Sequence, residues 1–169
     1  MCGIAGIISA KANKDVLQQM LKLQQHRGPD HTGNYVDSGY CALGHNRLSI
    51  IDLSAKANQP FKDNSGRYHL TFNGEIYNYK ELKQELKAHY NFRTESDTEV
   101  LLVTFIVWGK SCLNKLNGMF AFAIWDSREK KLFAARDRFG VKPFFYSEEN
   151  NDFYFSSEIK AIKSLLKSN

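Results

Sequence analysis

Several short segments of the chain alternate apolar and polar residues with the period of two that is typical of a β-strand. Tyr68, Leu70 and Phe72 alternate with polar neighbours, as in a strand with one buried face. Residues 119–125 are apolar at both alternating sets of positions, so this strand needs cover on both faces. The strands predicted in this way span residues 2–9, 40–51, 67–72, 119–125, 131–136, 144–147 and 153–156.

Other segments repeat apolar residues at the three- and four-residue spacing of an amphipathic helix. Asn13 and Asn78 stand where helix N-caps are expected. Ser96 and Glu99 have the spacing of a capping box, and Gly109 ends the helix that they open. The predicted helices span residues 15–25, 78–89, 96–108 and 157–167, the last with Ile159, Ile162, Leu165 and Leu166 facing inward.

The order of these elements indicates the fold class. Strands cluster and helices are grouped between them, without strict β-α-β alternation, so the pattern predicts an α+β fold with at least two sheets. Asn73-Gly74 is predicted to be a turn that closes the strand before it, because Asn-Gly is a preferred hairpin dipeptide. No linker, repeat or low-complexity segment interrupts the sequence, and we expect one domain over residues 1–169.

Composition narrows the environment and the partners. The formal charge is +5, but the lysines are scattered at helical spacing, which favours solvated helix faces over a nucleic-acid surface. Three widely spaced cysteines do not form a disulfide framework and fit a reducing compartment. The longest apolar stretch, residues 100–108, is too short to cross a membrane. We therefore expect a cytoplasmic protein that binds neither nucleic acid nor membranes.

Cys2 is the main candidate for chemistry. A cysteine within a strand is usually a packing residue. However, removal of Met1 before a small side chain would give Cys2 a free α-amine, whose ordinary pKa of about 7.7–8.0 suits a general base. Its thiol, with an ordinary pKa of about 8.5, is an accessible nucleophile. One residue could thus supply both the nucleophile and the base of an amide hydrolysis.

A second mechanism would pair Cys2 with a histidine, as in papain-like peptidases. The candidates are His26, His31, His45, His69 and His89. The residues around Cys2 lack the Cys-Gly-Ser-Cys-Trp pattern of that class, and the terminal amine makes a histidine unnecessary.

Five further residues suit the recognition of an amino-acid amide. Asn73 and the N–H of Gly74 could stabilise an oxyanion, beside or instead of their role as a turn. Arg47 could bind a carboxylate, while Glu75 and Asp97 could bind an ammonium group. Each of these charges could also be simply solvated, and Asp97 could compete with Ser96 as a helix cap.

In order along the chain, these pieces resemble one family, the class II glutamine amidotransferases, whose glutaminase domain is an N-terminal-nucleophile hydrolase. The matching motifs cover nearly the whole chain, and the second and third look like the asparagine synthetase branch rather than the glucosamine-phosphate or purine branches. They are Met-Cys-Gly-Ile-Ala-Gly at the start, then those beginning at His26 (His-Arg-Gly-Pro-Asp), Arg47 (Arg-Leu-Ser-Ile-Ile-Asp), Asn73 (Asn-Gly-Glu-Ile-Tyr-Asn), Ser96 (Ser-Asp-Thr-Glu), Gly118 (Gly-Met-Phe-Ala-Phe) and Arg138 (Arg-Phe-Gly-Val-Lys-Pro).

The resemblance implies a four-layer αββα sandwich of two antiparallel sheets and a glutaminase mechanism. Cys2 would attack the glutamine amide and pass through a γ-glutamyl thioester, with Asn73 and the Gly74 N–H stabilising the oxyanion. Arg47 would bind the substrate carboxylate, and Glu75 with Asp97 its ammonium group. Backbone around Leu48, Ile50 and Ile51 would line the pocket.

The resemblance also implies partners. This domain would need no metal or cofactor, and ATP and Mg²⁺ would belong to a synthetase domain that the sequence does not contain. Aspartate is the expected acceptor of the ammonia, with a sugar or a peptide as alternatives. A degenerate fold that binds glutamine without turnover is a further alternative. A general cysteine peptidase is disfavoured, because Arg47 with Asp97 suits a free amino acid better than a peptide.

Overall fold

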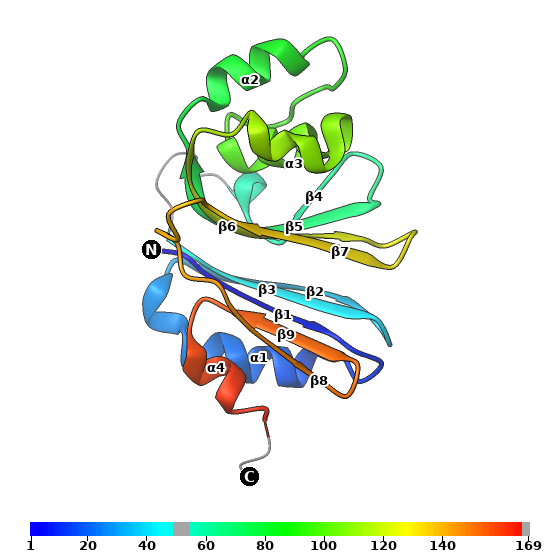
Figure 1. The fold of residues 1–169 in the computed structure, drawn as a ribbon, viewed down its shortest axis with the longest axis vertical. Helices are drawn as coiled ribbons and strands as arrows, with labels where there is room; N and C mark the ends of the chain where they lie inside the picture. Colours follow the sequence, from blue (N-terminus) through cyan, green and yellow to red (C-terminus); the bar gives the residue numbers. More distant parts are fainter. Residues whose placement is uncertain (49–54, 167–169) are drawn as a thin grey trace.

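The computed structural model has four layers, and it describes residues 1–48 and 55–166. Figure 1 shows two β-sheets stacked face to face, with α2 and α3 covering the outer face of one sheet and α1 and α4 that of the other. The N-terminus lies at one edge of the space between the sheets. This arrangement confirms the α+β class and the four-layer αββα sandwich.

The helices and strands follow in chain order. They are β1 (Gly3–Ile8), α1 (Lys14–Leu23), β2 (His31–Asp37), β3 (Cys41–Arg47), β4 (Phe61–Lys62), β5 (Tyr68–Ile76), α2 (Tyr79–Leu86), α3 (Asp97–Trp108), β6 (Gly118–Asp126), β7 (Lys131–Arg136), β8 (Phe145–Glu149), β9 (Asp152–Ser156) and α4 (Ile159–Lys163). Three short 3₁₀ helices lie between them, η1 (Gln25–Arg27), η2 (Ala55–Ala57) and η3 (Gly109–Asn114).

Both sheets are antiparallel throughout the described residues. One has the strand order β2-β3-β1-β9-β8 and the other β4-β5-β6-β7. The chain therefore starts in the centre of the first sheet, where β1 is paired on both sides. This central position fixes the residue before β1, Cys2, at the end of the space between the sheets.

The central strand β6 explains why residues 119–125 are apolar on both faces. Phe120, Phe122 and Ile124 pack in the core under α2 and α3. Ala121 and Trp125 face the opposite sheet and pack with residues such as Ile4 and Phe155. The prediction that this strand is covered on both faces is confirmed. A third core lies between the first sheet and the helices α1 and α4.

The prediction that Asn73-Gly74 forms a turn is wrong. Both residues lie inside β5, where Asn73 pairs with Ala121 and Gly74 with Phe120 of β6. The pairing of nine consecutive residues outweighs the local turn preference of the dipeptide. The sequence analysis also missed β2 and β4, which are too polar or too short to show an alternating pattern.

The helices differ from the prediction mainly at their ends. Ser96 caps α3 by accepting the N–H of Thr98, but the capping box is not formed. The N–H of Ser96 donates to Thr94 Oγ1, while Glu99 accepts N–H groups of the preceding loop. Asn78 caps α2 by position only, since its side chain bonds the backbone of Lys115 and Asn117. The final helix α4 is shorter than predicted.

Two of the four inward positions predicted for that helix are only partly buried, and one is exposed. Ile162 is buried, Leu165 and Leu166 pack against the core partly exposed, and Ile159 is 48% exposed. Ile159 is the first residue of α4, and its side chain lines a surface hollow between this helix and β8.

A buried histidine connects the two sheets. His45 of β3 has no exposed surface, and its Nε2 lies 3.0 Å from the carbonyl oxygen of Phe72 on β5. Because a carbonyl only accepts, Nε2 carries the proton in this contact. Burial lowers the pKa of His45 to about 3, so the ring is neutral at ordinary pH.

We expect the stability of the His45→Gln variant to depend less on pH in the acid range than that of the parent. The folded-state pKa lies below the unfolded value of 6.5, so the unfolded state gains a proton first and stability falls as the pH drops from 6.5 towards 3. Each pH unit in this range lowers the free energy of unfolding of the parent by about 1.4 kcal/mol. The variant should not show this loss, and its side-chain amide can still donate to the carbonyl oxygen of Phe72. Urea denaturation at pH 6, 5 and 4 measures the difference.

The matched control is His89→Gln, which removes an exposed histidine. Its stability should follow that of the parent across the same pH range. Parallel pH profiles for the parent and the His45→Gln protein would show that His45 is already protonated in the folded state.

Candidate active site

The thiol of Cys2 lies at the mouth of a cleft between the two sheets. Cys2 immediately precedes β1 and is half-buried. The backbone of Leu48 holds its sulfur, since the Leu48 N–H donates to Sγ at 3.3 Å and the Leu48 carbonyl oxygen lies at 3.5 Å. Burial raises the pKa of the Cys2 thiol above its ordinary value, and the Leu48 N–H only partly offsets this. The thiol is therefore neutral at rest and needs a base.

The His-Arg-Gly-Pro-Asp segment holds the backbone of the same residue. Arg27 Nε donates to the carbonyl oxygen of Cys2 at 3.0 Å, and its Nη1 bonds Glu158 at 2.9 Å. Gly28 packs directly on the end of β3, where a Cβ would lie 2.3 Å from the Asn46 carbonyl oxygen. These contacts fix Cys2 relative to the end of β3.

The hydrogen bonds of β5 alternate in direction. In an antiparallel ladder, every second pair exchanges no backbone hydrogen bonds. The even-numbered residues of β5 form such pairs with β6, so their N–H groups point to the opposite edge. There the N–H of Phe72 donates to Gln59 Oε1 at 2.6 Å, and that of Ile76 to Asp97 Oδ2 at 3.0 Å. Gly74 lies between them and lines the cleft, so its N–H is directed into the cleft.

The side chain of Asn73 points towards the other sheet. Its β6 partner is Ala121, which packs with Ile4 of β1 in the core between the sheets. Ile4 lies two residues after Cys2 and thus on the same face of its strand. Asn73 is 2% exposed, and its Nδ2 has no hydrogen-bond partner among the described residues. A buried donor without a partner is rare and indicates a position that a ligand can satisfy.

A positive charge borders the cleft close to Cys2. Arg47 is the last residue of β3 and is 8% exposed, and its Nη1 donates to Asn58 Oδ1 at 2.6 Å. Leu48 lines the cleft beside it. Ile50 and Ile51, which were predicted to line the pocket with Leu48, lie outside the described residues.

Two carboxylates lie on the side of the cleft opposite Arg47. Asp97 is the first residue of α3 and is 5% exposed, and Glu75 of β5 is half-buried. Burial raises the pKa of Asp97 to about 6, although the Ile76 N–H opposes the increase. Asp97 is therefore ionised at neutral pH at a desolvation cost that a cationic ligand would reduce.

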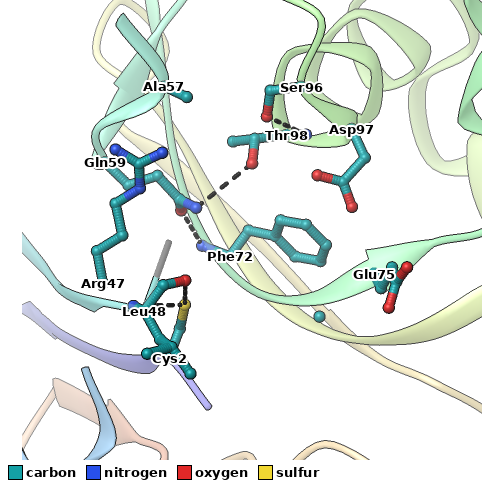
Figure 2. Close-up of a pocket in the computed structure, with 11 residues that line it drawn as sticks. Cys2, Arg47, Leu48, Ala57, Gln59, Phe72, Glu75, Ser96, Asp97 and Thr98 are labelled. Carbon is teal, nitrogen blue, oxygen red and sulfur yellow. Dashed lines mark hydrogen bonds between the residues drawn. The ribbon is translucent and has the colours of Figure 1, made fainter. Parts of the chain in front are cut away.

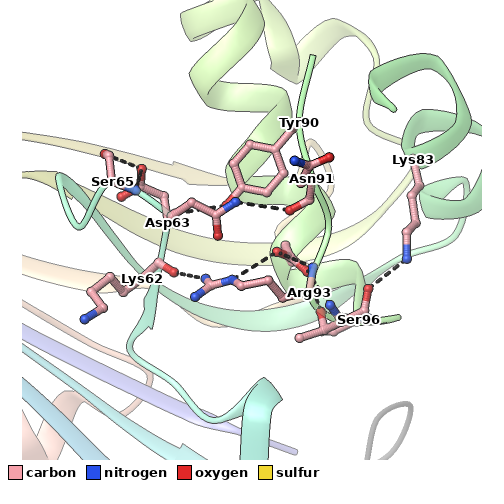
Figure 3. Close-up of polar contacts among 11 residues, drawn as sticks. Lys62, Asp63, Ser65, Lys83, Tyr90, Asn91, Arg93 and Ser96 are labelled. Atoms are coloured by element: carbon pink, nitrogen blue, oxygen red, sulfur yellow. Dashed lines mark hydrogen bonds and ion pairs between the residues drawn. The ribbon is translucent and has the colours of Figure 1, made fainter. Parts of the chain in front are cut away.

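A polar network fixes the loop that delivers Asp97 to the cleft. Arg93 donates to the Lys62 carbonyl, and the N–H groups of Arg93 and Thr94 both bond the fully buried Glu99. Lys83 Nζ donates to the carbonyl oxygen of Thr94 at 2.7 Å. Figure 3 shows these contacts between the β4 region, the loop before α3 and α2. The start of α3 is thus tied to three neighbouring segments.

The cleft brings together most of the residues that the sequence singled out. The cleft is partly open to solvent. Figure 2 shows Cys2 and Arg47 on one side and Asp97 and Glu75 on the other. The lining residues are Cys2, Arg47, Leu48, Ala57, Gln59, Phe72, Gly74, Glu75, Ser96, Asp97 and Thr98. A nucleophile, oxyanion donors and charges of both signs suit the hydrolysis of an amide in a zwitterion.

Comparison with known proteins identifies this arrangement. Residues 1–169 match the family described as a glutamine amidotransferase domain. The chain belongs to the class II glutamine amidotransferases.

Relatives of this amidotransferase domain include asparagine synthetases. Asparagine synthetase [glutamine-hydrolyzing] 3 of Bacillus subtilis (strain 168) is 43% identical, over 96% of this chain and 27% of that protein. A putative asparagine synthetase of Methanocaldococcus jannaschii is 40% identical, over 100% of this chain and 36% of that protein. Amidase chry2 of Gibberella zeae is 39% identical, over 96% and 26%. The chain thus spans about a quarter to a third of the length of these relatives.

Solved structures support the fold of the amidotransferase domain. The glutamine phosphoribosylpyrophosphate amidotransferase from B. subtilis superposes with a TM-score of 0.81 at 24% identity, over 96% of this chain and 43% of that one. A structure described as the allosteric regulatory enzyme of purine biosynthesis gives a TM-score of 0.82 at 25% identity, with the same coverage. No helix within the described ranges is long and apolar enough to cross a membrane.

Three histidines of the amidotransferase domain have side-chain contacts away from Cys2. His45 bonds Phe72, His69 stacks on Tyr35 at 3.6 Å between ring centroids, and His26 lies 3.5 Å from Glu158. The backbone of His31 pairs with Arg47 in the β2–β3 ladder, while its buried Nδ1 has no partner among the described residues, and His89 is exposed. Among the described residues that line the cleft, none is a histidine, which disfavours a Cys-His mechanism.

Gln59 is a site residue that the sequence analysis missed. It is 7% exposed, accepts the Phe72 N–H and lies 3.4 Å from Thr98 Oγ1, so it joins β5 to the start of α3. Arg27 was also missed as a side chain with a contact of its own to Cys2. Nothing in the sequence around Gln59 marks it as buried. Arg27 lies in the His-Arg-Gly-Pro-Asp motif, but the sequence analysis assigned no role to the individual residues of that motif.

We expect the Asp97→Asn variant to be more stable than the parent at pH 7.5, by about 1–3 kcal/mol. The folded-state pKa of Asp97 is raised, so the destabilisation is complete above about pH 6 and absent below the ordinary value of 3.8. The asparagine oxygen can still accept the Ile76 N–H. Urea denaturation should show the gain at pH 7.5 and its disappearance at pH 4.

The exposed Glu148→Gln change is the control and should alter stability little at either pH. An Asp97→Asn protein that is less stable than the parent at pH 7.5 would mean that ionised Asp97 supports the fold rather than straining it.

Proposed function

We propose that the domain, once Met1 is removed, hydrolyses L-glutamine to L-glutamate and ammonia through a thioester on Cys2. The observation that carries this proposal is the placement of the Cys2 thiol in a cleft into which the N–H of Gly74 is directed. Asn73, the preceding residue of β5, lies behind the lining of this cleft, and its buried Nδ2 has no partner among the described residues. Such donors stabilise charge that develops on an amide oxygen.

In the first half-reaction, the Cys2 α-amine takes the proton of the neutral thiol, directly or through one water molecule. The sulfur attacks the side-chain amide carbon of glutamine, and the oxygen gains negative charge facing Asn73 and Gly74. The α-ammonium then gives its proton to the departing nitrogen, the C–N bond breaks and ammonia leaves. A γ-glutamyl thioester remains on Cys2.

In the second half-reaction, water replaces ammonia. The α-amine accepts a proton from the attacking water, the same donors stabilise the second oxyanion, and the C–S bond breaks. Glutamate leaves, and the proton returns to the sulfur. All these steps use groups of Cys2, Asn73 and Gly74, so we propose no cofactor or metal for this domain.

Recognition of the substrate uses the separation of charges across the cleft. We assign the substrate carboxylate to Arg47 and its ammonium group to Asp97 with Glu75, while Leu48 forms the wall between Arg47 and the thiol. We retain Ile50 and Ile51 as proposed neighbours of Leu48. A free amino acid satisfies both charges at once, whereas an internal residue of a peptide satisfies neither.

We further propose that a synthetase domain or subunit uses the ammonia, with ATP and Mg²⁺ bound there and aspartate as the acceptor. The names and lengths of the asparagine synthetase relatives support this proposal. The similarity to an amidase keeps a sugar or peptide acceptor as an alternative. The reduced, unpaired cysteines support a cytoplasmic location.

The test compares the Met-free chain with one that retains Met1. We expect the Met-free chain to release ammonia from glutamine, and the Cys2→Ala protein to lose turnover while still binding glutamine. The Met1-retaining chain should be inactive, because its Cys2 nitrogen is an amide that cannot accept a proton. Intact-mass spectrometry beside an ammonia assay and calorimetric titration with glutamine measures all three.

The outcomes separate the alternatives. Binding by the Met-free chain without any turnover would support a glutamine-binding module instead of an enzyme. Full activity in a population that still carries Met1 would exclude the α-amine as the base and favour a histidine. Glutamate release by the Cys2→Ala protein would exclude the thioester.

A second experiment separates recognition from catalysis. Arg47 meets a carboxylate that changes little during the reaction, so Arg47→Ala should mainly raise KM. Asn73 faces charge that forms only in the transition state, so Asn73→Ala should lower kcat by about 10²–10³-fold. The Gly74 N–H should leave residual activity. Steady-state kinetics of both variants, with the exposed Lys131→Met as control, shows which parameter changes.

An Asn73→Ala protein that changes only KM would refute the oxyanion assignment. The unpaired Asn73 amide would then bind the substrate in its ground state.

A further inference from the structure

Lys142 is a buried ammonium group beside the N-terminus that the mechanism above does not use. It lies in the loop between β7 and β8, which Figure 1 shows passing next to the start of the chain. The residue is 6% exposed, and its Nζ lies 3.6 Å from the sulfur of Met1. Met1 is bonded to the nitrogen of Cys2, and the charge of Lys142 also acts on the Cys2 thiol, so Lys142 lies near the residue whose α-amine becomes free.

The loop around Lys142 is held rigidly. Asp137 accepts the backbone N–H groups of Phe120, Phe139, Val141 and Lys142 at 2.9–3.2 Å. Burial alone would raise the pKa of Asp137, but these N–H groups hold it below its ordinary value, so the carboxylate stays ionised. Arg136 Nε also donates to the Lys142 carbonyl oxygen at 2.6 Å. The backbone of Lys142 is therefore fixed, and its side chain is not simply a mobile surface group.

Fold stability does not explain this lysine. Within residues 1–48 and 55–166, no carboxylate lies within ion-pair distance of its Nζ, and Asp137 binds its backbone rather than its ammonium group. A buried cation without a paired anion destabilises a fold.

We propose that Lys142 is a positioning residue for Cys2, acting by charge: in the Met-free domain its ammonium group favours the unprotonated α-amine and the ionised thiol. A nearby cation disfavours an ammonium group and favours a thiolate. The ordinary α-amine is mostly protonated at pH 7, so a base of this kind needs such a shift. This inference rests on the proposed function, to which it adds the origin of the active base.

Other charged residues around Cys2 also affect the pKa values of its α-amine and thiol. Arg27 bonds its carbonyl oxygen, Arg47 lies beside its sulfur across Leu48, and both are present in every variant described below. Glu158 neutralises Arg27, while Glu75 and Asp97 lie on the far side of the cleft. The positive charges of Arg47 and Lys142 both lower the pKa of the Cys2 thiol against the effect of its burial. Lys142 is the one of these cations that contacts the residue bonded to the Cys2 nitrogen.

The test replaces Lys142 in the Met-free chain by Met, which keeps the length of the side chain without the charge, and by Arg, which keeps the charge. In Lys142→Met, the acid limb of kcat/KM for glutamine should move up by about one pH unit. Activity at pH 6.5 should fall about five- to tenfold and that at pH 9 should stay near the parent's. Lys142→Arg and the exposed control Lys131→Met should keep the parent's profile.

A second readout does not depend on turnover. The rate of Cys2 alkylation by iodoacetamide, followed against pH by peptide mass spectrometry, should show the same upward shift in Lys142→Met. Cys41 and Cys112 have no exposed surface and are resolved as separate peptides. Thermal unfolding identifies a misfolded variant, in which case Lys142→Gln serves as the uncharged replacement.

Unchanged pH midpoints in both assays, in a folded uncharged variant, would refute the role of Lys142 and leave the glutaminase proposal intact. Absence of turnover in the parent would instead refute the proposed function, and the alkylation profile would still decide whether Lys142 controls Cys2. A uniform loss of activity at every pH, with no shift of the midpoint, would also refute the proposal and assign Lys142 a purely structural role.

Discussion

The alternation of hydrogen bonds along β5 is the constraint on which the site depends. Only every second pair of the β5–β6 ladder exchanges backbone hydrogen bonds, so the N–H groups of Phe72, Gly74 and Ile76 face the other edge. β4 pairs with that edge at His69 and Leu70, and no other strand within residues 1–48 and 55–166 pairs with it. The side chains of Gln59 and Asp97 accept the N–H groups of Phe72 and Ile76. The N–H of Gly74, which lies between these two, is directed into the cleft. The glycine is required there, because a Cβ would lie 2.3 Å from the Met119 carbonyl oxygen.

The same strand connects this edge with the nucleophile in the opposite sheet. Thr71 donates to the Gly44 carbonyl oxygen at 2.9 Å, and the Phe72 carbonyl accepts from His45, so β5 is bonded to β3 at two adjacent residues. β3 ends at Arg47, next to Cys2. Asn73, Gly74 and the Cys2 thiol therefore belong to one connected framework, although they lie on different sheets. A distortion of either sheet would separate the thiol from the two groups to which we assign the stabilisation of the oxyanion.

Elements with a strong local pattern could be predicted, and those that depend on distant contacts could not. Residues 119–125 carry the two apolar faces of a strand buried on both sides, and the structure confirms them as β6. Asn73-Gly74 has the local pattern of a turn, but pairing with β6 extends it into a strand. The residues grouped by family motifs, such as Arg47 and Asp97, do meet at the cleft. Gln59 was not predicted because only the fold buries it, and nothing in its neighbouring sequence marks a buried polar side chain. Lys142 lies in the motif that begins at Arg138, but the sequence alone does not show that the fold buries it beside the N-terminus.

The destabilising groups of the described chain concentrate around this cleft. Asn73 has a buried amide nitrogen without a partner, Asp97 keeps its charge against burial, and Lys142 is a buried cation without a carboxylate. Each would be removed if stability alone governed the sequence, because apolar residues of similar size cost less to bury. In the proposed reaction, a bound glutamine would offer an oxygen to Asn73 and an ammonium group to Asp97, which would lower the cost of burying both groups. The cost of burying Lys142 would remain, and its proposed effect on the Cys2 α-amine explains why a lysine is kept at this position.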